Sequence, residues 1–154
     1  MNKLTRLITA ALCTAVPLRM LSAELVRDGR TDYVVVIGTN GEYDKFAAGE
    51  FTEIMQKSTG ADFRTAASGT PEAAAGKRIF IGDSPEMRNF MKEKEIEKLE
   101  REESLVRECD GNLIIVGGGN HGTAYGVYHF LEEEVGYRCF TPLPGGERIP
   151  RIRP

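Results

Sequence analysis

The stretch of residues 108–142 constrains the fold of this chain more than any other. It contains, in order, a turn, an apolar run at 113–116, a glycine loop, an amphipathic helix and a closing strand at 137–140. The turn holds Asp110-Gly111, and a two-residue loop of this composition connects adjacent antiparallel strands. We therefore expect the weakly alternating residues 104–108 to pair antiparallel with residues 113–116.

Hydrophobic runs indicate the other strands. The β-branched run at 33–37 and the apolar run at 78–81 are typical of strands buried on both faces. Residues 62–66 form a weaker strand candidate. Residues 67–76 are small, polar and interrupted by Pro and Gly, so they are expected to form a loop.

Helical periodicity appears in three places. Helices are expected at 43–60, at about 84–92 and at 120–136, with start and stop signals that include Pro85, Gly60 and Gly136. The mixed charge run that follows the second helix, to residue 103, is interpreted as a solvated helical face. The apolar stripe of the third helix consists of Ala124, Val127, Tyr128, Leu131 and Val135.

The resulting order of elements is β-α-β-β-α-β-β-α-β. It predicts an α+β fold, with a mixed, mostly antiparallel sheet and helices packed on one face. The length suits one domain, which we expect at residues 24–143. Residues 144–154 are rich in Pro, Gly and Arg and are expected to form an extended tail that is not a packed element.

The first 23 residues have the pattern of a secretory signal peptide. Lys3 and Arg6 precede an apolar run at 7–18 that is too short to span a bilayer. Cleavage is expected after Ala23, which gives an exported protein, periplasmic or extracellular, with no membrane attachment. An uncleaved anchor is the alternative, whereas lipidation of Cys13 is rejected because no small residue directly precedes it.

The charge of the chain argues against some partners. The formal net charge is −3, and the expected signal peptide holds Lys3, Arg6 and Arg19 but no acid, so its removal leaves −6. A mildly acidic surface argues against binding to nucleic acid or to anionic membranes.

The glycine loop has the spacing of a dinucleotide-binding turn, Gly117-x-Gly119-x-x-Gly122, after a strand and before a helix. Such a site also needs a further parallel strand that ends in an acid for the ribose, and residues 137–140 are followed by no acid. The expected antiparallel hairpin also argues against it. We therefore interpret these glycines as a structural turn, and Gly126, inside the following helix, as a point of close approach to the sheet.

No catalytic, cofactor-binding or metal-ligating residue is expected. His121 and His129 lack further ligands at metal spacing, and the acids at 132–134 are consecutive on a helix and are interpreted as a solvated face. Cys109 and Cys139 are expected to be two buried free thiols, and a disulfide between them is the alternative in an exported protein.

Segments along most of the chain match one known kind of domain. They are the helix at 46–60, the strand Ile79-Phe80-Ile81-Gly82, the hairpin at 109–116, Gly117 with the helix at 122–132, the strand at 136–142 and the tail Gly146-Glu147-Arg148-Ile149-Pro150. Together they resemble the N-terminal α+β domain that precedes the catalytic barrel in glycoside hydrolases such as β-hexosaminidases and α-glucuronidases. The resemblance covers about residues 25–151, and it departs from the family at Cys139, where an aromatic residue is usual.

The resemblance implies that catalytic carboxylates lie on the barrel, which this chain does not contain, so no family catalytic residue is carried over. The expected function is a non-catalytic accessory domain of a secreted carbohydrate-active enzyme, truncated or separately encoded. Its expected partner is a glycosidase barrel, with residues 144–154 as the linker to that barrel. The alternatives are a stand-alone exported module that binds carbohydrate or protein and, third, nucleotide binding at the glycine loop. The expected docking surface consists of Tyr137, Arg138, Phe140 and Pro142.

Overall fold

The computed structural model of this chain describes residues 25–152. The expected signal peptide, its cleavage site after Ala23 and Cys13 lie outside the described residues. Within residues 25–152, no helix is both long enough and apolar enough to cross a membrane.

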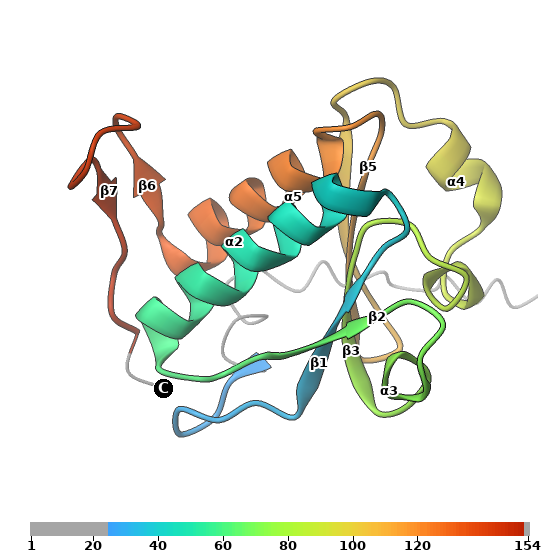
Figure 1. Ribbon diagram of the computed structural model, residues 1–154, viewed down its shortest axis with the longest axis horizontal. Helices are drawn as coiled ribbons and strands as arrows, with labels where there is room; N and C mark the ends of the chain where they lie inside the picture. The colour runs from blue at the N-terminus through green and yellow to red at the C-terminus, as the bar shows by residue number, and fades with distance from the viewer. Residues whose placement is uncertain (1–24, 153–154) are drawn as a thin grey trace, which may run out of the picture.

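A five-stranded sheet forms the centre of the domain, in the order β2-β1-β3-β5-β4 (Figure 1). The strands are β1 Tyr33–Ile37, β2 Arg64–Ala67, β3 Lys77–Ile81, β4 Ser104–Cys109 and β5 Asn112–Gly117. β1 is parallel to β2 and to β3, and β3 is parallel to β5. Only β4 and β5 are antiparallel, joined by the expected Asp110-Gly111 turn.

The α+β class and the mixed sheet are thus confirmed, but the expectation of a mostly antiparallel sheet is wrong. The reason lies in the connections. Only the two-residue turn between β4 and β5 is short enough to require antiparallel neighbours, whereas the other connections are long enough to cross back over the sheet, as parallel pairing needs.

Two long helices cover one face of the sheet, side by side (Figure 1). They are α2, Gly41–Thr59, and α5, Gly122–Phe130, which continues into a π-helical turn, η3, Leu131–Val135. α2 ends at Gly60 in a left-handed conformation, as expected from a C-terminal glycine.

Short helices cover the other face, so the expectation that helices pack on one face only is wrong. They are α3, Pro71–Ala74, the 3₁₀ turn η2, Met87–Asn89, and α4, Glu93–Glu97. α3 lies where a loop is expected, and the helix expected at about 84–92 is reduced to η2. Met87 and Met91 are nevertheless buried against the sheet, so this segment still contributes apolar cover.

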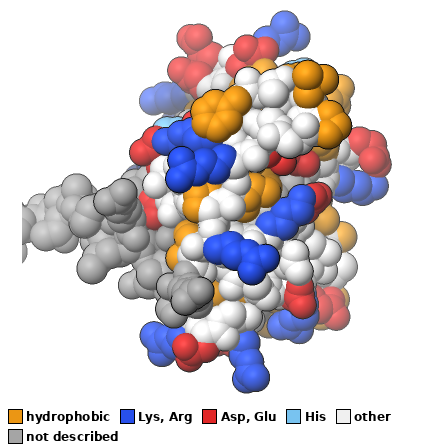
Figure 2. Space-filling model, turned by 90° about the vertical axis from the view of Figure 1, so that its left-hand side faces the viewer, with side chains coloured by type: hydrophobic (Ala, Val, Ile, Leu, Met, Phe, Trp, Pro, Cys, Tyr) orange, Lys and Arg blue, Asp and Glu red, His pale blue; other side chains and the backbone are white. Residues whose placement is uncertain are grey.

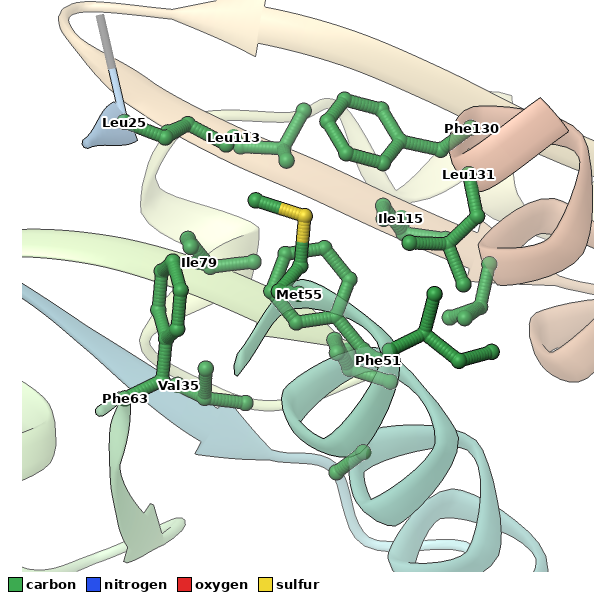
Figure 3. Close-up of a cluster of buried hydrophobic side chains, with 14 of the residues drawn as sticks. Leu25, Val35, Phe51, Met55, Phe63, Ile79, Leu113, Ile115, Phe130 and Leu131 are labelled. Atoms are coloured by element: carbon green, nitrogen blue, oxygen red, sulfur yellow. The ribbon is translucent and has the colours of Figure 1, made fainter. Parts of the chain in front are cut away.

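The larger part of the core lies between the sheet and the two long helices (Figure 3). Phe51 of α2 contacts Phe63 and Phe130, with ring centroids 5.6 and 5.7 Å apart. A smaller cluster on the other face includes Phe80 and Ile114. Because both faces are covered, β1, β3 and β5 are continuous apolar runs rather than alternating ones.

The closing strand does not join the main sheet. β6, Arg138–Cys139, pairs with β7, Glu147–Arg148, in a separate antiparallel hairpin beyond the ends of the long helices (Figure 1). The tail after it is extended, as expected, but it is packed. The Ile152 N–H donates to the Ser58 carbonyl at 2.9 Å, and Ile149 and Ile152 contact the core.

Candidate functional site

The carboxyl edge of the parallel strands is the first place to look for a site. The chain leaves β1 towards β2 on one side, while β3 lies on the other side of β1, so the strand order reverses between β1 and β3. Open sheets with parallel strands bind ligands in the crevice outside such a reversal. Here Gly38, Gly82 and Gly117 follow or end β1, β3 and β5, and both long helices begin at this edge.

The side chain of Asp44 fills this position. Asp44 is 1% exposed, and its Oδ2 accepts a hydrogen bond of 2.9 Å from the Asn40 N–H. A Cβ at Gly38 or at Gly82 would overlap the Asp44 carboxylate, so these glycines leave room for it. The crevice is therefore closed by the chain itself.

Burial raises the pKa of Asp44, against the lowering effect of the hydrogen bonds from the Asn40 N–H and the Thr123 side chain, and the nearby Asp83 raises it further. Sequence reasoning missed Asp44. The available signal was an acid beside Ala47 and Phe51 on the buried side of α2.

The glycine loop is packed against a neighbouring segment. The Gly118 N–H donates to the Glu103 carbonyl at 2.8 Å, and the Gly122 N–H to the Gly118 carbonyl at 3.2 Å. A Cβ at Gly117 would overlap Gly122, and a Cβ at Gly118 would overlap the Glu100 carbonyl. The expectation that the antiparallel hairpin argues against a dinucleotide site is corrected, because β5, the strand before this loop, also has a parallel neighbour in β3. The N–H groups of Gly118 and Gly122 are already bonded and the loop is covered at Glu100, and both features disfavour a pyrophosphate at this turn.

The other two glycines singled out in the sequence serve different needs. Gly119 has a φ of +62°, a conformation that favours glycine. Gly126 lies on the sheet side of α5, where a Cβ would come 2.9 Å from Ile115 Cγ2 and 3.1 Å from Ser104 Cβ.

The histidines and acids are dispersed. His121 and His129 are exposed, and within the part of the chain that the structure describes, no cluster of three or more His, Cys, Asp or Glu side chains could hold a metal ion. The interpretation of residues 132–134 as a solvated face is wrong for Glu134, which is buried. η3 is a π-helical turn, wider than an α-helical one, and it changes the direction of the side chains that follow.

Both described cysteines are free thiols, so the alternative of a disulfide is not observed. Cys109 is half-buried, with its Sγ 3.4 Å from the Phe90 carbonyl. Cys139 is exposed rather than buried, because it lies on the separate hairpin and not in the main sheet.

The expected docking residues all lie on or beside the C-terminal hairpin, residues 138–148. Tyr137 is buried, however, and cannot be part of a contact surface. Its ring stacks on Tyr128 with centroids 6.1 Å apart, and its hydroxyl donates to Glu147 Oε1 at 2.9 Å. Burial and this hydrogen bond raise the pKa of Tyr137.

The remaining docking candidates are exposed. Phe140 is 75% exposed, and Arg138 and Pro142 are also on the surface. Sequence reasoning missed Leu143, which is 67% exposed at the hairpin tip. Figure 2 shows this side of the molecule, with apolar side chains in its upper part and Lys and Arg side chains across its middle. Arg138 is held by hydrogen bonds from Nη1 to the carbonyls of Glu132 and Tyr137, at 3.0 and 2.8 Å.

Comparison with known proteins identifies no family for this chain. No protein-family model matches the chain, and no curated protein matches it. Among solved structures, it is similar to a family GH115 4-O-methyl-α-glucuronidase described as specific for decorated arabinogalactans, with 17% identity and a TM-score of 0.46. The match covers 64% of this chain and 13% of that one. A likeness at this level does not identify a family.

Proposed function

We propose that this chain is a non-catalytic accessory domain of a secreted, glycoside hydrolase-like enzyme, and that the C-terminal hairpin docks on the catalytic domain. The observation that carries the proposal is the exposure of Phe140 and Leu143 on one hairpin tip, with Pro142 between them. Large apolar side chains grouped on a surface mark interaction sites, and aromatic and Arg side chains are enriched there.

The C-terminal hairpin is held in place by contacts with the rest of the domain. A two-stranded hairpin is marginally stable in water by itself. This one is tied to the domain through the Tyr137–Glu147 hydrogen bond, the stacking of Tyr137 on Tyr128 and the hydrogen bonds of Arg138. A contact surface that is already ordered loses less conformational entropy on docking.

The distribution of acids supports a non-catalytic role. Glycosidases use two carboxyl groups that flank the scissile bond, one of which needs a raised pKa to act as an acid. Asp44 is an acid with a pKa raised by burial, but its carboxylate is enclosed beside Gly38 and Gly82. Asp28 and Asp32 line a hollow of about 370 Å³, but both are exposed.

Screening the purified chain against aryl glycosides, including glucuronides and N-acetylhexosaminides, tests the proposal. We expect no turnover above that of a mock purification. Turnover that co-purifies with the chain and disappears on substitution of one of its own Asp or Glu residues would contradict it. The coding sequence after Pro154 is a second test, because an in-frame catalytic barrel supports the accessory role.

A further inference from the structure

A second group of exposed aromatic side chains lies away from the hairpin, on the outer side of the two long helices. Tyr43, Phe46 and Tyr125 are each between 44% and 55% exposed. The exposed His121 joins the helices here, since its ring centroid is 5.6 Å from that of Tyr43 and 6.3 Å from that of Tyr125. We call these four residues the α2–α5 aromatic face.

Acids lie along the same side. Glu42, Phe46 and Glu50 follow one another at intervals of four residues on α2 and so share one stripe of the helix. Glu50 accepts a 2.8 Å hydrogen bond from the Tyr128 hydroxyl, which ties α2 to α5 about one helical turn after Phe46. Lys45 is paired with Glu42 at 2.7 Å. A carboxylate has room for further donors, so both acids remain available as acceptors.

The combination of exposed ring faces and acids is the chemistry that recognises a guanidinium group. Arg is planar and weakly hydrated, stacks on aromatic rings and pairs with carboxylates through two parallel hydrogen bonds. The chain uses such contacts on its other face, where the Arg78 guanidinium lies 5.0 Å from the Phe90 ring centroid. The same acids repel phosphate, which argues against a nucleic-acid partner.

We propose that the α2–α5 aromatic face binds an arginine-bearing peptide segment of another protein, with the guanidinium groups stacked on Phe46 and Tyr125 and held by Glu42 and Glu50. An arginine side chain is favoured because its positive charge complements Glu42 and Glu50 and its planar guanidinium group stacks on flat aromatic rings. This surface is separate from the C-terminal hairpin, and the inference does not depend on the accessory-domain proposal.

The probe is a capped hexapeptide of alternating Gly and Arg, titrated into the isotopically labelled chain and followed by NMR. We expect saturable shifts centred on the four residues of the face. The matching Gly-Lys peptide should bind about threefold or more weakly, and a Gly-citrulline peptide, planar but uncharged, more weakly still. Equal affinity for the three peptides, or a neutral oligosaccharide that binds this face when the Arg peptide does not, would overturn the proposal.

Variants locate the contact. Phe46→Ala and Tyr125→Ala each should weaken binding by about threefold to tenfold, and both side chains are exposed enough for the variants to fold, which circular dichroism checks. Phe140→Ala is the control, since it removes an even more exposed aromatic ring from the hairpin and should leave binding unchanged. Wild-type affinity in both helix variants, or a loss in Phe140→Ala as large as theirs, would show that the assignment is wrong.

Discussion

At the scale of single residues, Asp44 is the clearest case in which the structure gives a side chain an environment that its sequence position does not predict. It is a charged residue type in the first turns of a helix, where acids are usual on the surface. Here it is buried between the ends of β1 and β3, and Gly38 and Gly82 have no side chains that would displace it. Open sheets with parallel strands bind ligands at this position, whereas in this domain the Asp44 carboxylate occupies it.

The raised pKa of Asp44 predicts a pH effect on stability. The folded chain holds the Asp44 proton more tightly than the unfolded chain, whose pKa is close to the ordinary value of 3.8. The contribution of this group is therefore complete below that value and is lost as pH rises through the folded-state pKa. Asp44→Asn keeps the shape without the ionisation.

We expect the free energy of unfolding of the wild type, measured in urea relative to Asp44→Asn, to fall as the pH rises above the ordinary carboxyl pKa of 3.8. The comparison removes the pH dependence of all other groups. A difference that stays constant as the pH rises above this value, or that increases, would mean that burial does not disfavour the Asp44 charge.

At the scale of elements, the contact of α5 with the sheet depends on Gly126. A side chain there would meet Ile115 of β5 and Ser104 of β4, the two strands that the Asp110-Gly111 turn joins. Gly49 of α2 provides the contrast, because a Cβ there would meet nothing within 4 Å. Two glycines within helices thus have opposite packing environments.

Substitution of each by Leu tests this contrast. Gly126→Leu should lower the free energy of unfolding by about 1–3 kcal/mol through overpacking, whereas Gly49→Leu should leave it unchanged or raise it by up to about 1 kcal/mol. Denaturant unfolding of both variants gives the values. Similar effects at the two positions would indicate that α5 does not approach the sheet closely at Gly126.

At the scale of the whole molecule, the tail belongs to the domain rather than leading away from it as a free linker. Its backbone is held at the end of α2 by the Ile152 N–H bond to Ser58 and by the Ser58 hydroxyl, which donates to the Pro150 carbonyl at 2.5 Å. Ile149 and Ile152 pack against the main core. Any segment attached after the tail would leave the domain beside the end of α2.

Replacing Ile149 and Ile152 together by Ala should therefore lower the free energy of unfolding by about 1–2 kcal/mol, as partial burial of two apolar side chains implies. Leu143→Ala is the control, because this exposed side chain at the hairpin tip should change stability by less than about 0.5 kcal/mol. Unfolding measurements that give the double variant wild-type stability would mean that the packing of Ile149 and Ile152 does not stabilise the domain.

The sequence by itself determined the local features of this protein. Continuous apolar runs located β1, β3 and β5, the period of α2 and α5 located the long helices, and Asp110-Gly111 set the antiparallel pair of the five-stranded sheet. These signals depend on neighbours a few residues apart, so they can be read without knowing the fold.

Tertiary structure alone decided the rest. Strand direction elsewhere in the sheet, the cover on its second face and the burial of Asp44, Glu134 and Tyr137 depend on how distant segments pack. So does the α2–α5 aromatic face, whose residues come from two helices far apart in sequence. The physical reason is that the hydrophobic effect is not directional, so an apolar side chain gains burial free energy from contact with any other apolar surface. Which distant segments make these contacts is limited by how the chain connects its strands and helices, and a local pattern does not show this.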